Sequence, residues 1–320
     1  MDVIVLAGGF GTRLRPWTET VPKPLLPILD KTMIEHVVDV LPESLVDRVL
    51  IAAGYGIEKM RSHFANTHLP YEVRIIEEAA PLGTGGAIAN CKSHLSGDTF
   101  CVINGDLITS LRVEEMLDFH RSNGGIGTIA LWEVEDPSRF GVADYREESG
   151  KIMRFQEKPP IEEAYSNLIN AGTYILEPEI FNLMPMGAHS IERDVYEDLA
   201  ETGGLNGFPY EGWFVDAGTP SSFIEATQVC IAESKFDSGS VTGDSWFGKN
   251  SENLGSVSGS SLGHSSIVGA EASVTNSVIL QGAEIGAGSI LDGCLIGSGA
   301  KIPEGVEMAG KIVNHDSFQE

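Results

Sequence analysis

Two patterns of apolar positions alternate along the first 235 residues of the chain. Runs rich in apolar residues, which are typical of buried strands, occupy residues 3–7, 48–53, 73–77 and 100–104. Apolar positions at helical spacing separate these runs, over residues 33–41, 57–64 and 113–120, and a further helix is expected from about residue 85. The alternation predicts an α/β fold whose mostly parallel sheet is buried on both faces.

The stretch beyond residue 125 is richer in strand patterns than in helical ones. Apolar runs occur there at residues 126–132, 151–156 and 172–176. We expect these strands to form a smaller β-containing lid or insertion.

A different repeat begins near residue 262. Aliphatic residues recur every five or six positions, at Leu262, Val268, Val274, Ile279, Ile285, Leu291, Ile296 and Ile302. This spacing predicts a β-solenoid, in which each short strand sends one aliphatic side chain inward and small residues turn the corners. Two or three coils are barely enough for a free-standing array, so they should stack on something else. Residues 237–261 are rich in Ser and Gly and form either a linker or irregular first coils.

Composition and charge narrow the classes of partner. The chain has 320 residues and a net charge of −25, which argues against binding to nucleic acid or to an anionic membrane. No apolar run approaches the length of about 18 residues that a membrane span needs. The four cysteines stand far apart and form no metal-binding pair, so we expect a cytoplasmic protein.

The first apolar run leads into a glycine-rich loop, VIVLAGGFGTRLRP from Val3. It lacks the Gly-Lys-Ser/Thr ending of a P-loop. The dinucleotide fingerprint begins with Gly9 and Gly11 but meets Leu14, where a small residue is needed. What remains is a loop whose backbone N–H groups can approach a polyphosphate, with Arg13 placed to bind the terminal phosphates.

Nine motifs together resemble those of the sugar-1-phosphate nucleotidyltransferases, which join a nucleoside triphosphate to a sugar 1-phosphate and release pyrophosphate. In chain order they read LAGGFGTRLRP, PKPLLP, EAAPLGTGGA, NGD, FGVAD, FQEKP, NAG, SIERD and WFVDAGTP. The resemblance implies a Rossmann-like nucleotidyltransferase domain over residues 1–236, with a mostly parallel mixed sheet. It also implies a short C-terminal left-handed β-helix of hexapeptide repeats over residues 262–313.

The resemblance implies a role for individual residues. Nucleotide binding falls to Leu6, Ala7, Gly8, Gly9, Gly11, Thr12, Arg13, Glu78, Leu82, Gly83 and Thr84. Sugar-phosphate binding falls to Gly141, Glu157, Lys158, Asn170 and Gly172. The catalytic set is Arg13, Lys23, Asp106, Lys158 and Asp216. Within it, Asp106 and Asp216 resemble carboxylates that bind Mg²⁺, a cation that prefers carboxylate and phosphate oxygens.

The chemistry explains why cations and carboxylates are needed. The attacking phosphate oxygen is already an anion at pH 7, because the second pKa of a phosphate monoester is about 6. No general base is required, so catalysis depends on holding anionic groups in line and neutralising their charge. A bound Mg²⁺ would neutralise charge and act as a template.

The motifs identify the substrates less directly than the class of reaction. The LGT and SIER strings most resemble mannose-1-phosphate guanylyltransferases, which make GDP-mannose from GTP. Glu78 can accept from both N–H groups of a guanine edge, whereas uracil and thymine offer one donor. NGD differs from the NSD common in guanylyltransferases, so a glucose-1-phosphate thymidylyltransferase or uridylyltransferase stays an alternative.

Two further alternatives concern the class of protein. Some relatives bind nucleotide sugars without catalysis and regulate an active partner, and some carry an acyltransferase in the β-helix. The intact basic loop and acidic pair favour an enzyme, and so few coils offer little wall for an acyl-donor site. We expect a homo-oligomer, because open solenoid ends and exposed apolar ridges favour association.

Overall fold

The computed structural model describes residues 1–67 and 69–315, and the chain divides into two compact units. The first unit joins Met1–Gly9 to Val37–Phe214, and the second joins Phe10–His36 to the chain from Val215 onward. The short segment 10–36 therefore belongs with the C-terminal part, although it follows the first strand.

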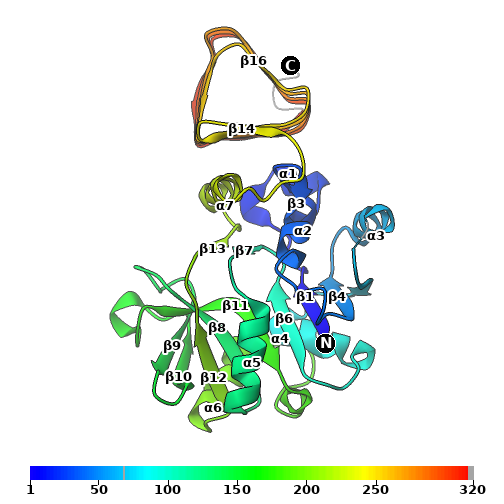
Figure 1. Ribbon diagram of the computed structural model, residues 1–320, viewed down its shortest axis with the longest axis vertical. Coiled ribbons are helices and arrows are strands. Elements are labelled where there is room, and N and C mark those ends of the chain that lie inside the picture. Colours follow the sequence, from blue (N-terminus) through cyan, green and yellow to red (C-terminus); the bar gives the residue numbers. More distant parts are fainter. Residues whose placement is uncertain (68, 316–320) are drawn as a thin grey trace. The chain divides into compact units, whose positions relative to one another are not determined.

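Nine strands of the first unit form one sheet in the order β5-β4-β1-β6-β11-β8-β12-β10-β9 (Figure 1). The first four strands in this order run parallel to one another: β5 (Glu72–Glu77), β4 (Arg48–Ala53), β1 (Asp2–Leu6) and β6 (Phe100–Asn104). Val5 lies opposite Ile51 on one side and Ile103 on the other, and all three side chains are fully buried. The four predicted strands are confirmed; burial on both faces explains the nearly continuous apolar runs of β1, β4 and β6, whereas the edge strand β5 is more exposed and alternates with polar residues.

The other strands make the sheet mixed. They are β8 (Gly127–Glu133), β9 (Gly141–Arg146), β10 (Lys151–Glu157), β11 (Leu168–Leu176) and β12 (Leu205–Pro209). Strand β11 runs antiparallel to β6 and β8, β12 runs parallel to β8, and β10 runs antiparallel to β9 and β12.

The expectation of a separate lid or insertion is wrong for these strands. Strands β8 and β11 lie in the middle of the main sheet, where β11 pairs directly with β6. Their apolar runs are long and almost wholly buried. Such runs are typical of central strands, so the sequence pattern itself argued for the main sheet.

Helices flank this sheet. They are α3 (Ile57–Asn66), α4 (Gly83–Cys91), α5 (Val113–Asn123) and α6 (Glu197–Glu201). Helix α4 packs on β1 and β4, α5 on β8 and β12, and α6 on β10. Ile88 of α4 joins Ile4, Leu50 and Val102 in the core between helix and sheet.

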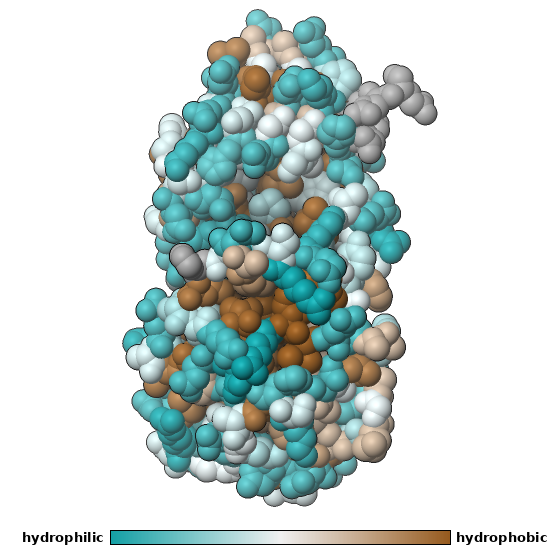
Figure 2. Space-filling model, turned by 90° about the vertical axis from the view of Figure 1, so that its right-hand side faces the viewer, coloured by the Kyte–Doolittle hydropathy of each residue, from teal (hydrophilic) through white to brown (hydrophobic). Residues whose placement is uncertain are grey.

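Strand β5 forms one edge of the sheet, and α3 borders it. A groove of about 370 Å³ lies there. Its lining consists of Arg61, Phe64, Ala65, Thr67, Leu69, Tyr71, Val73 and Ile75. Figure 2 views the side on which α3 lies in Figure 1, and apolar side chains gather in a hollow of that face. None of the predicted site residues lines this groove.

Most of the second unit is a coil of short strands with a triangular outline (Figure 1). One face carries β14 (Ser240–Thr242), β15 (Ser245–Phe247), β18 (Ser261–Leu262), β21 (Val278–Ile279), β24 (Leu295–Ile296) and β27 (Ile312–Val313). A second carries β16 (Glu252–Asn253), β19 (Ile267–Val268), β22 (Glu284–Ile285) and β25 (Lys301–Ile302). The third carries β17 (Ser256–Ser258), β20 (Ser273–Thr275), β23 (Ile290–Asp292) and β26 (Glu307–Ala309).

Equivalent positions stack from coil to coil. Leu262 pairs with Ile279, Ile279 with Ile296, and Ile296 with Val313, in parallel register. These side chains are buried in one cluster inside the coil. The arrangement is consistent with the predicted left-handed β-helix, and it explains why one aliphatic residue recurs per strand. Residues 240–258, for which the sequence left open a linker or irregular first coils, carry the strands β14–β17.

The segment 10–36 completes the second unit together with the long helix α7 (Pro220–Ala232). It contains the single-turn elements η1 (Thr12–Leu14), α1 (Trp17–Thr20) and η2 (Lys23–Leu25). The hairpin of β2 (Pro27–Ile28) and β3 (Lys31–Thr32) follows, and α2 (Met33–Val38) leads back to the first unit. Helix α7 begins with a capping box between Thr219 and Ser222.

Candidate functional site

Three charged side chains of the second unit converge on one glycine. A Cβ atom added to Gly218 would lie 2.8 Å from Arg13 Nη2 and 2.8 Å from Asp216 Oδ1. The same Cβ would lie 3.4 Å from Lys23 Nζ. Two cations and one carboxylate therefore border the space that the missing side chain leaves. Sequence reasoning missed Gly218, although it stands inside the WFVDAGTP motif.

The loop that carries Arg13 is closed by close contacts around Gly11. Gly11 has a φ of 61°, and a Cβ there would meet Thr18 Cγ2 at 2.9 Å and Lys23 Cβ at 3.0 Å. Thr18 Oγ1 donates to the carbonyl oxygen of Gly11 over 2.9 Å. Only glycine combines this positive φ with so close an approach. Thr12, next along the chain, begins η1, and Arg13 follows within it.

Lys23 is held at the start of η2, between Pro22 and Pro24. It is only 8% exposed, unusual for a lysine. Asp216 ends β13 (Phe214–Asp216), two residues before Gly218. These observations bring together Gly11, Arg13, Lys23 and Asp216 of the predicted site within the second unit.

In the first unit, the Glu78 carboxylate faces the glycine loop. Glu78 is 7% exposed, and a Cβ added to Gly8 would lie 2.8 Å from its Oε1 atom. Burial raises the pKa of this carboxyl, and the backbone N–H of Leu82 partly offsets that rise. Among the described residues, Oε1 has no hydrogen-bond partner. A buried acceptor without a partner is costly unless a ligand donates to it.

The segment around Leu82, Gly83 and Thr84 is fixed by backbone contacts. The His189 N–H donates to the Leu82 carbonyl over 2.9 Å, and a Cβ on Gly83 would lie 2.5 Å from the His189 carbonyl oxygen. Gly83 also has a φ of 71°, so this position requires glycine. Thr84 stands in the first turn of α4.

Glu192 connects this segment to the strand that carries Asn170. Its Oε2 atom accepts from Thr84 Oγ1 over 2.5 Å and from Ser190 Oγ over 2.6 Å, and Oε1 accepts from the Tyr174 hydroxyl over 3.3 Å. The Tyr174 hydroxyl in turn accepts from Asn170 Nδ2 over 3.0 Å. Burial raises the pKa of Tyr174 well above its ordinary value, so it stays a donor to Glu192. Glu192 belongs to the SIERD motif, but the sequence assigned it no role.

The predicted sugar-binding residues form two groups. In one, Asn170 Oδ1 accepts from the Gly172 N–H over 2.9 Å, and a Cβ on Gly172 would lie 2.5 Å from Asn104 Nδ2. Asn104 Oδ1 is buried and, in the part of the chain that is described, has no partner. Asn104 of the NGD motif was another residue that sequence reasoning missed.

The second group surrounds the end of β10. A Cβ on Gly141 would lie 2.9 Å from Glu157 Oε2, while Glu157 Oε1 accepts from Lys158 Nζ over 2.6 Å. The Glu157 side chain is 9% exposed and that of Lys158 is 55% exposed, so the lysine ammonium reaches solvent. Lys158 has a φ of 54°, which is uncommon for a residue other than glycine.

The remaining predicted residues of the first unit lie where parallel strands end. Leu6 is the last residue of β1, and its carbonyl oxygen accepts from the Gly105 N–H over 2.9 Å. Ala7 donates to the Ala52 carbonyl oxygen over 2.8 Å. Asp106 follows Gly105 directly after β6. In open α/β sheets ligands bind beyond this carboxyl edge, where Gly8 and Gly9 also follow β1.

Among the described residues, the candidate metal ligands do not form one cluster of side chains. Over the described ranges, no group of three or more His, Cys, Asp or Glu side chains could hold an ion. Asp106 and Asp216 still offer the hard oxygen donors that Mg²⁺ prefers, and this cation usually completes its shell with phosphate oxygens and waters. No described helix has the length and apolar character that crossing a membrane would require.

The mixed sheet with a glycine loop at its carboxyl edge and the coil of short parallel strands define an α/β protein with a C-terminal β-helix. The chain belongs to the nucleotidyl transferase family, whose sequence model, described as Nucleotidyl transferase, matches residues 2–233. A second model, described as GlmU-like, C-terminal hexapeptide, matches residues 232–317. Members of the family generally use divalent metal ions.

Among similar proteins is Mannose-1-phosphate guanylyltransferase 1 of Arabidopsis thaliana, 36% identical over 236 residues, or 72% of this chain. The match covers 65% of that relative, slightly less than two thirds of its length. A crystal structure of HddC from Yersinia pseudotuberculosis complexed with GMP-PN is 30% identical, with a TM-score of 0.60 over 71% of this chain and 98% of that one. UDP-glucose pyrophosphorylase complexed with UDP-glucose is 25% identical, with a TM-score of 0.64 over 73% and 98%.

Proposed function

We propose that this protein is a nucleotidyltransferase that converts GTP and mannose 1-phosphate into GDP-mannose and pyrophosphate. The observation that carries the proposal is the convergence of Arg13, Lys23 and Asp216 on Gly218. Two cations and a carboxylate around a glycine suit a polyphosphate and its metal ion, because a side chain would fill the space that the anion needs. Family membership and the relative from Arabidopsis support the same reaction.

The residues divide the work of binding. Arg13 and Lys23 would neutralise the departing pyrophosphate, and Lys158 would bind the phosphate of the sugar. Leu6, Ala7, Gly8, Gly9, Gly11 and Thr12 would supply backbone groups to the triphosphate, and Leu82, Gly83 and Thr84 would border the base. Gly141, Glu157, Asn170 and Gly172 would hold sugar hydroxyls. The sugar phosphate is already deprotonated at pH 7, so none of these residues has to remove a proton.

Asp106 and Asp216 would hold Mg²⁺, since carboxylate oxygens are its ordinary protein ligands. When bound, the ion supplies charge neutralisation and a template for the phosphates. Lys23, buried beside Asp216, would keep the carboxylate oriented while the ion is absent.

Guanine is favoured by the orphaned acceptor of Glu78. Oε1 is buried with no partner among the described residues, and a second oxygen lies beside it. Guanine presents two neighbouring N–H donors, one for each oxygen of a carboxylate. Thymine or uracil would satisfy one oxygen and leave the other buried without a donor, at a cost of about 1–3 kcal/mol.

The test is a substrate matrix. The full chain with Mg²⁺ is given GTP, UTP or dTTP, each with mannose or glucose 1-phosphate, and pyrophosphate release is followed. We expect the fastest release with GTP and mannose 1-phosphate. Preference for UTP or dTTP with glucose 1-phosphate would replace the proposed substrates, and no release with any pair would contradict an active enzyme.

Arg13→Ala and Arg15→Ala form a matched pair for the catalytic assignment. Both residues are exposed arginines of one loop, and Arg13 is the one whose Nη2 atom is among the nearest to the space at Gly218. We expect Arg13→Ala to lose at least ~10²-fold in turnover, the usual effect of removing a preorganised donor. Arg15→Ala should stay near the wild-type rate, and equal losses in both variants would contradict the role of Arg13.

We also propose a cytoplasmic homo-oligomer that binds neither nucleic acid nor membrane. The net charge of −25 supports the absence of polyanionic partners, and the four cysteines, all described and buried, form no disulfide. Exposed Ile267 and Ile290 on the β-helix support self-association. Light scattering of the purified chain tests the oligomer, and a monomer at micromolar concentration would contradict it.

A further inference from the structure

Helix α1 of the second unit contacts the last strand of the β-helix through one side chain. Trp17 is 3% exposed, and its indole Nε1 donates to the Val313 carbonyl oxygen of β27 over 3.0 Å. The same ring packs edge-on against Phe223 of α7, with centroids 5.8 Å apart. The start of α1 is thus tied both to the end of the β-helix and to α7.

The next residue of α1 holds the glycine loop. Thr18 is 3% exposed, and its Oγ1 atom donates to the Gly11 carbonyl oxygen over 2.9 Å. Its methyl carbon lies 2.9 Å from the point where a Cβ of Gly11 would stand. The contacts form a continuous series from Val313 through Trp17 and Thr18 to Gly11, two residues before Arg13.

Helix α1 is too short to hold this geometry by itself. It spans four residues, and one helical turn in isolation is unstable because its nucleation is costly. Its orientation therefore depends on the tertiary contacts of its buried residues. Trp17 contacts the β-helix, and Thr18, the next residue, contacts the glycine loop.

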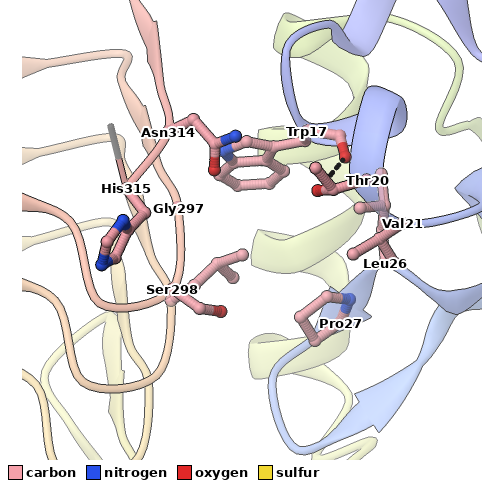
Figure 3. Close-up of a pocket in the computed structure, with 10 residues that line it drawn as sticks. Trp17, Thr20, Val21, Leu26, Pro27, Gly297, Ser298, Asn314 and His315 are labelled. Atoms are coloured by element: carbon pink, nitrogen blue, oxygen red, sulfur yellow. Dashed lines mark hydrogen bonds between the residues drawn. The ribbon is translucent and has the colours of Figure 1, made fainter. Parts of the chain in front are cut away.

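A pocket of about 300 Å³ lies beside Trp17, and its lining includes Val21, Pro27, Ser298 and Asn314 (Figure 3). The indole itself is buried, and a Cβ added to Gly297 of the β-helix would lie 3.0 Å from its Nε1 atom. The hydrogen bond to Val313, the ring contact with Phe223 and this close approach of Gly297 therefore fix the ring.

We propose that Trp17 is a positioning residue, through which the last coil of the β-helix sets the conformation of the loop from Gly11 to Arg13. This inference rests on the proposed function for what the loop binds, but the mechanical link is independent of the substrate. It gives the β-helix a part in the reaction besides any role in association.

Trp246 offers a matched control in the same unit. It is fully buried, its Nε1 atom donates to the Ser238 carbonyl oxygen over 3.1 Å, and its ring meets that of His264 edge-on at 5.7 Å. These contacts lie inside the β-helix segment. Trp17→Phe and Trp246→Phe therefore remove the same kind of hydrogen bond, once beside the loop and once within the coil.

The experiment compares the full-length wild type, Trp17→Phe and Trp246→Phe. It measures kcat, the KM of each substrate and amide hydrogen exchange over residues 10–23. We expect Trp17→Phe to lower kcat roughly tenfold, as misplacement of a binding loop does, and to speed exchange over residues 10–23. Trp246→Phe should lower the melting temperature and leave both quantities at wild-type values.

Equal kcat and equal loop exchange in the two variants would overturn the inference. If Trp17→Phe does not fold, Thr18→Val breaks the next contact in the series while keeping the side-chain volume, and the same loop effects are expected from it. A wild type that releases no pyrophosphate would refute the proposed function alone, because the exchange comparison would still decide the role of Trp17.

Discussion

Gly218→Ala adds one methyl group at the point where three charged atoms meet. The new Cβ would lie 2.8 Å from both Arg13 Nη2 and Asp216 Oδ1. Ordinary contacts of carbon lie at about 3.5–4.0 Å, so each group would have to retreat by about 0.7 Å or more. Gly218 does not adopt a positive φ, so alanine places no strain on the backbone. The variant should therefore fold normally while the charged cluster loses its geometry.

The size of the effect follows from that displacement. Misplacing a reacting group by about 1 Å costs up to ~10²-fold in rate, and losing one preorganised donor costs about as much. Because Arg13 and Asp216 are displaced together, we expect kcat to fall at least ~10²-fold. The melting temperature should stay within the few degrees that correspond to about 1 kcal/mol.

The assay is pyrophosphate release with GTP, mannose 1-phosphate and Mg²⁺, together with thermal unfolding of each variant. Ser221→Ala is the control, because it changes an exposed residue three positions away and adds nothing near the charged cluster. A Gly218→Ala enzyme within about threefold of the wild-type kcat, at an unchanged melting temperature, would refute the assignment of the cluster to catalysis.

Three further predictions test the other clusters. Burial raises the Glu78 pKa, so GTP affinity should rise with pH as this carboxyl ionises through its raised pKa. The free energy of unfolding should fall over the same pH range, because the folded state disfavours the charged carboxylate. Glu78→Gln should remove both pH dependences, as measured by binding and urea-unfolding titrations. Glu192→Gln should raise the KM of both substrates together by about tenfold, since one amide oxygen cannot accept from Thr84, Ser190 and Tyr174 at once. A change in the KM of one substrate alone would contradict the role of Glu192 in connecting the Thr84 segment to the strand that carries Asn170. Chelation with EDTA should stop pyrophosphate release, excess Mg²⁺ should restore it, and unchanged release after dialysis against EDTA would contradict the metal.

The sequence predicted the parts of the fold that depend on regular burial. Central strands such as β1 are apolar along most of their length, here from Val3 to Leu6, because both faces are covered, and the β-helix repeats one inward aliphatic residue per strand. The lid expectation failed because β11 pairs with β6, more than 60 residues earlier in sequence, and β8 joins the same sheet between β11 and β12. Periodicity identifies a strand but does not say which neighbour it will take.

The site residues that the sequence did not predict were missed for a related reason. Arg13, Lys23 and Asp216 were predicted from motifs as separate residues, whereas the requirement for Gly218 comes from the space that the three share. Asn104 and Glu192 were missed because their importance lies in contacts with Gly172 and Thr84, which are distant along the chain. Their places inside the recognised motifs WFVDAGTP, NGD and SIERD were the one signal in the sequence that could have pointed to them.

The buried ammonium of Lys23, in the charged cluster around Gly218, is important because the chain as a whole carries a large negative charge. A chain at −25 repels an anionic triphosphate, but at physiological salt the field of exposed carboxylates fades within about 8 Å. What decides binding is therefore the charge at contact distance, where Lys23 is 8% exposed and little screened by solvent. The flanking Pro22 and Pro24 restrict its backbone. In the proposed reaction two anions would be bound by a few cations that act locally, and a displacement of less than 1 Å in one of these cations should then matter more than the loss of several surface acids.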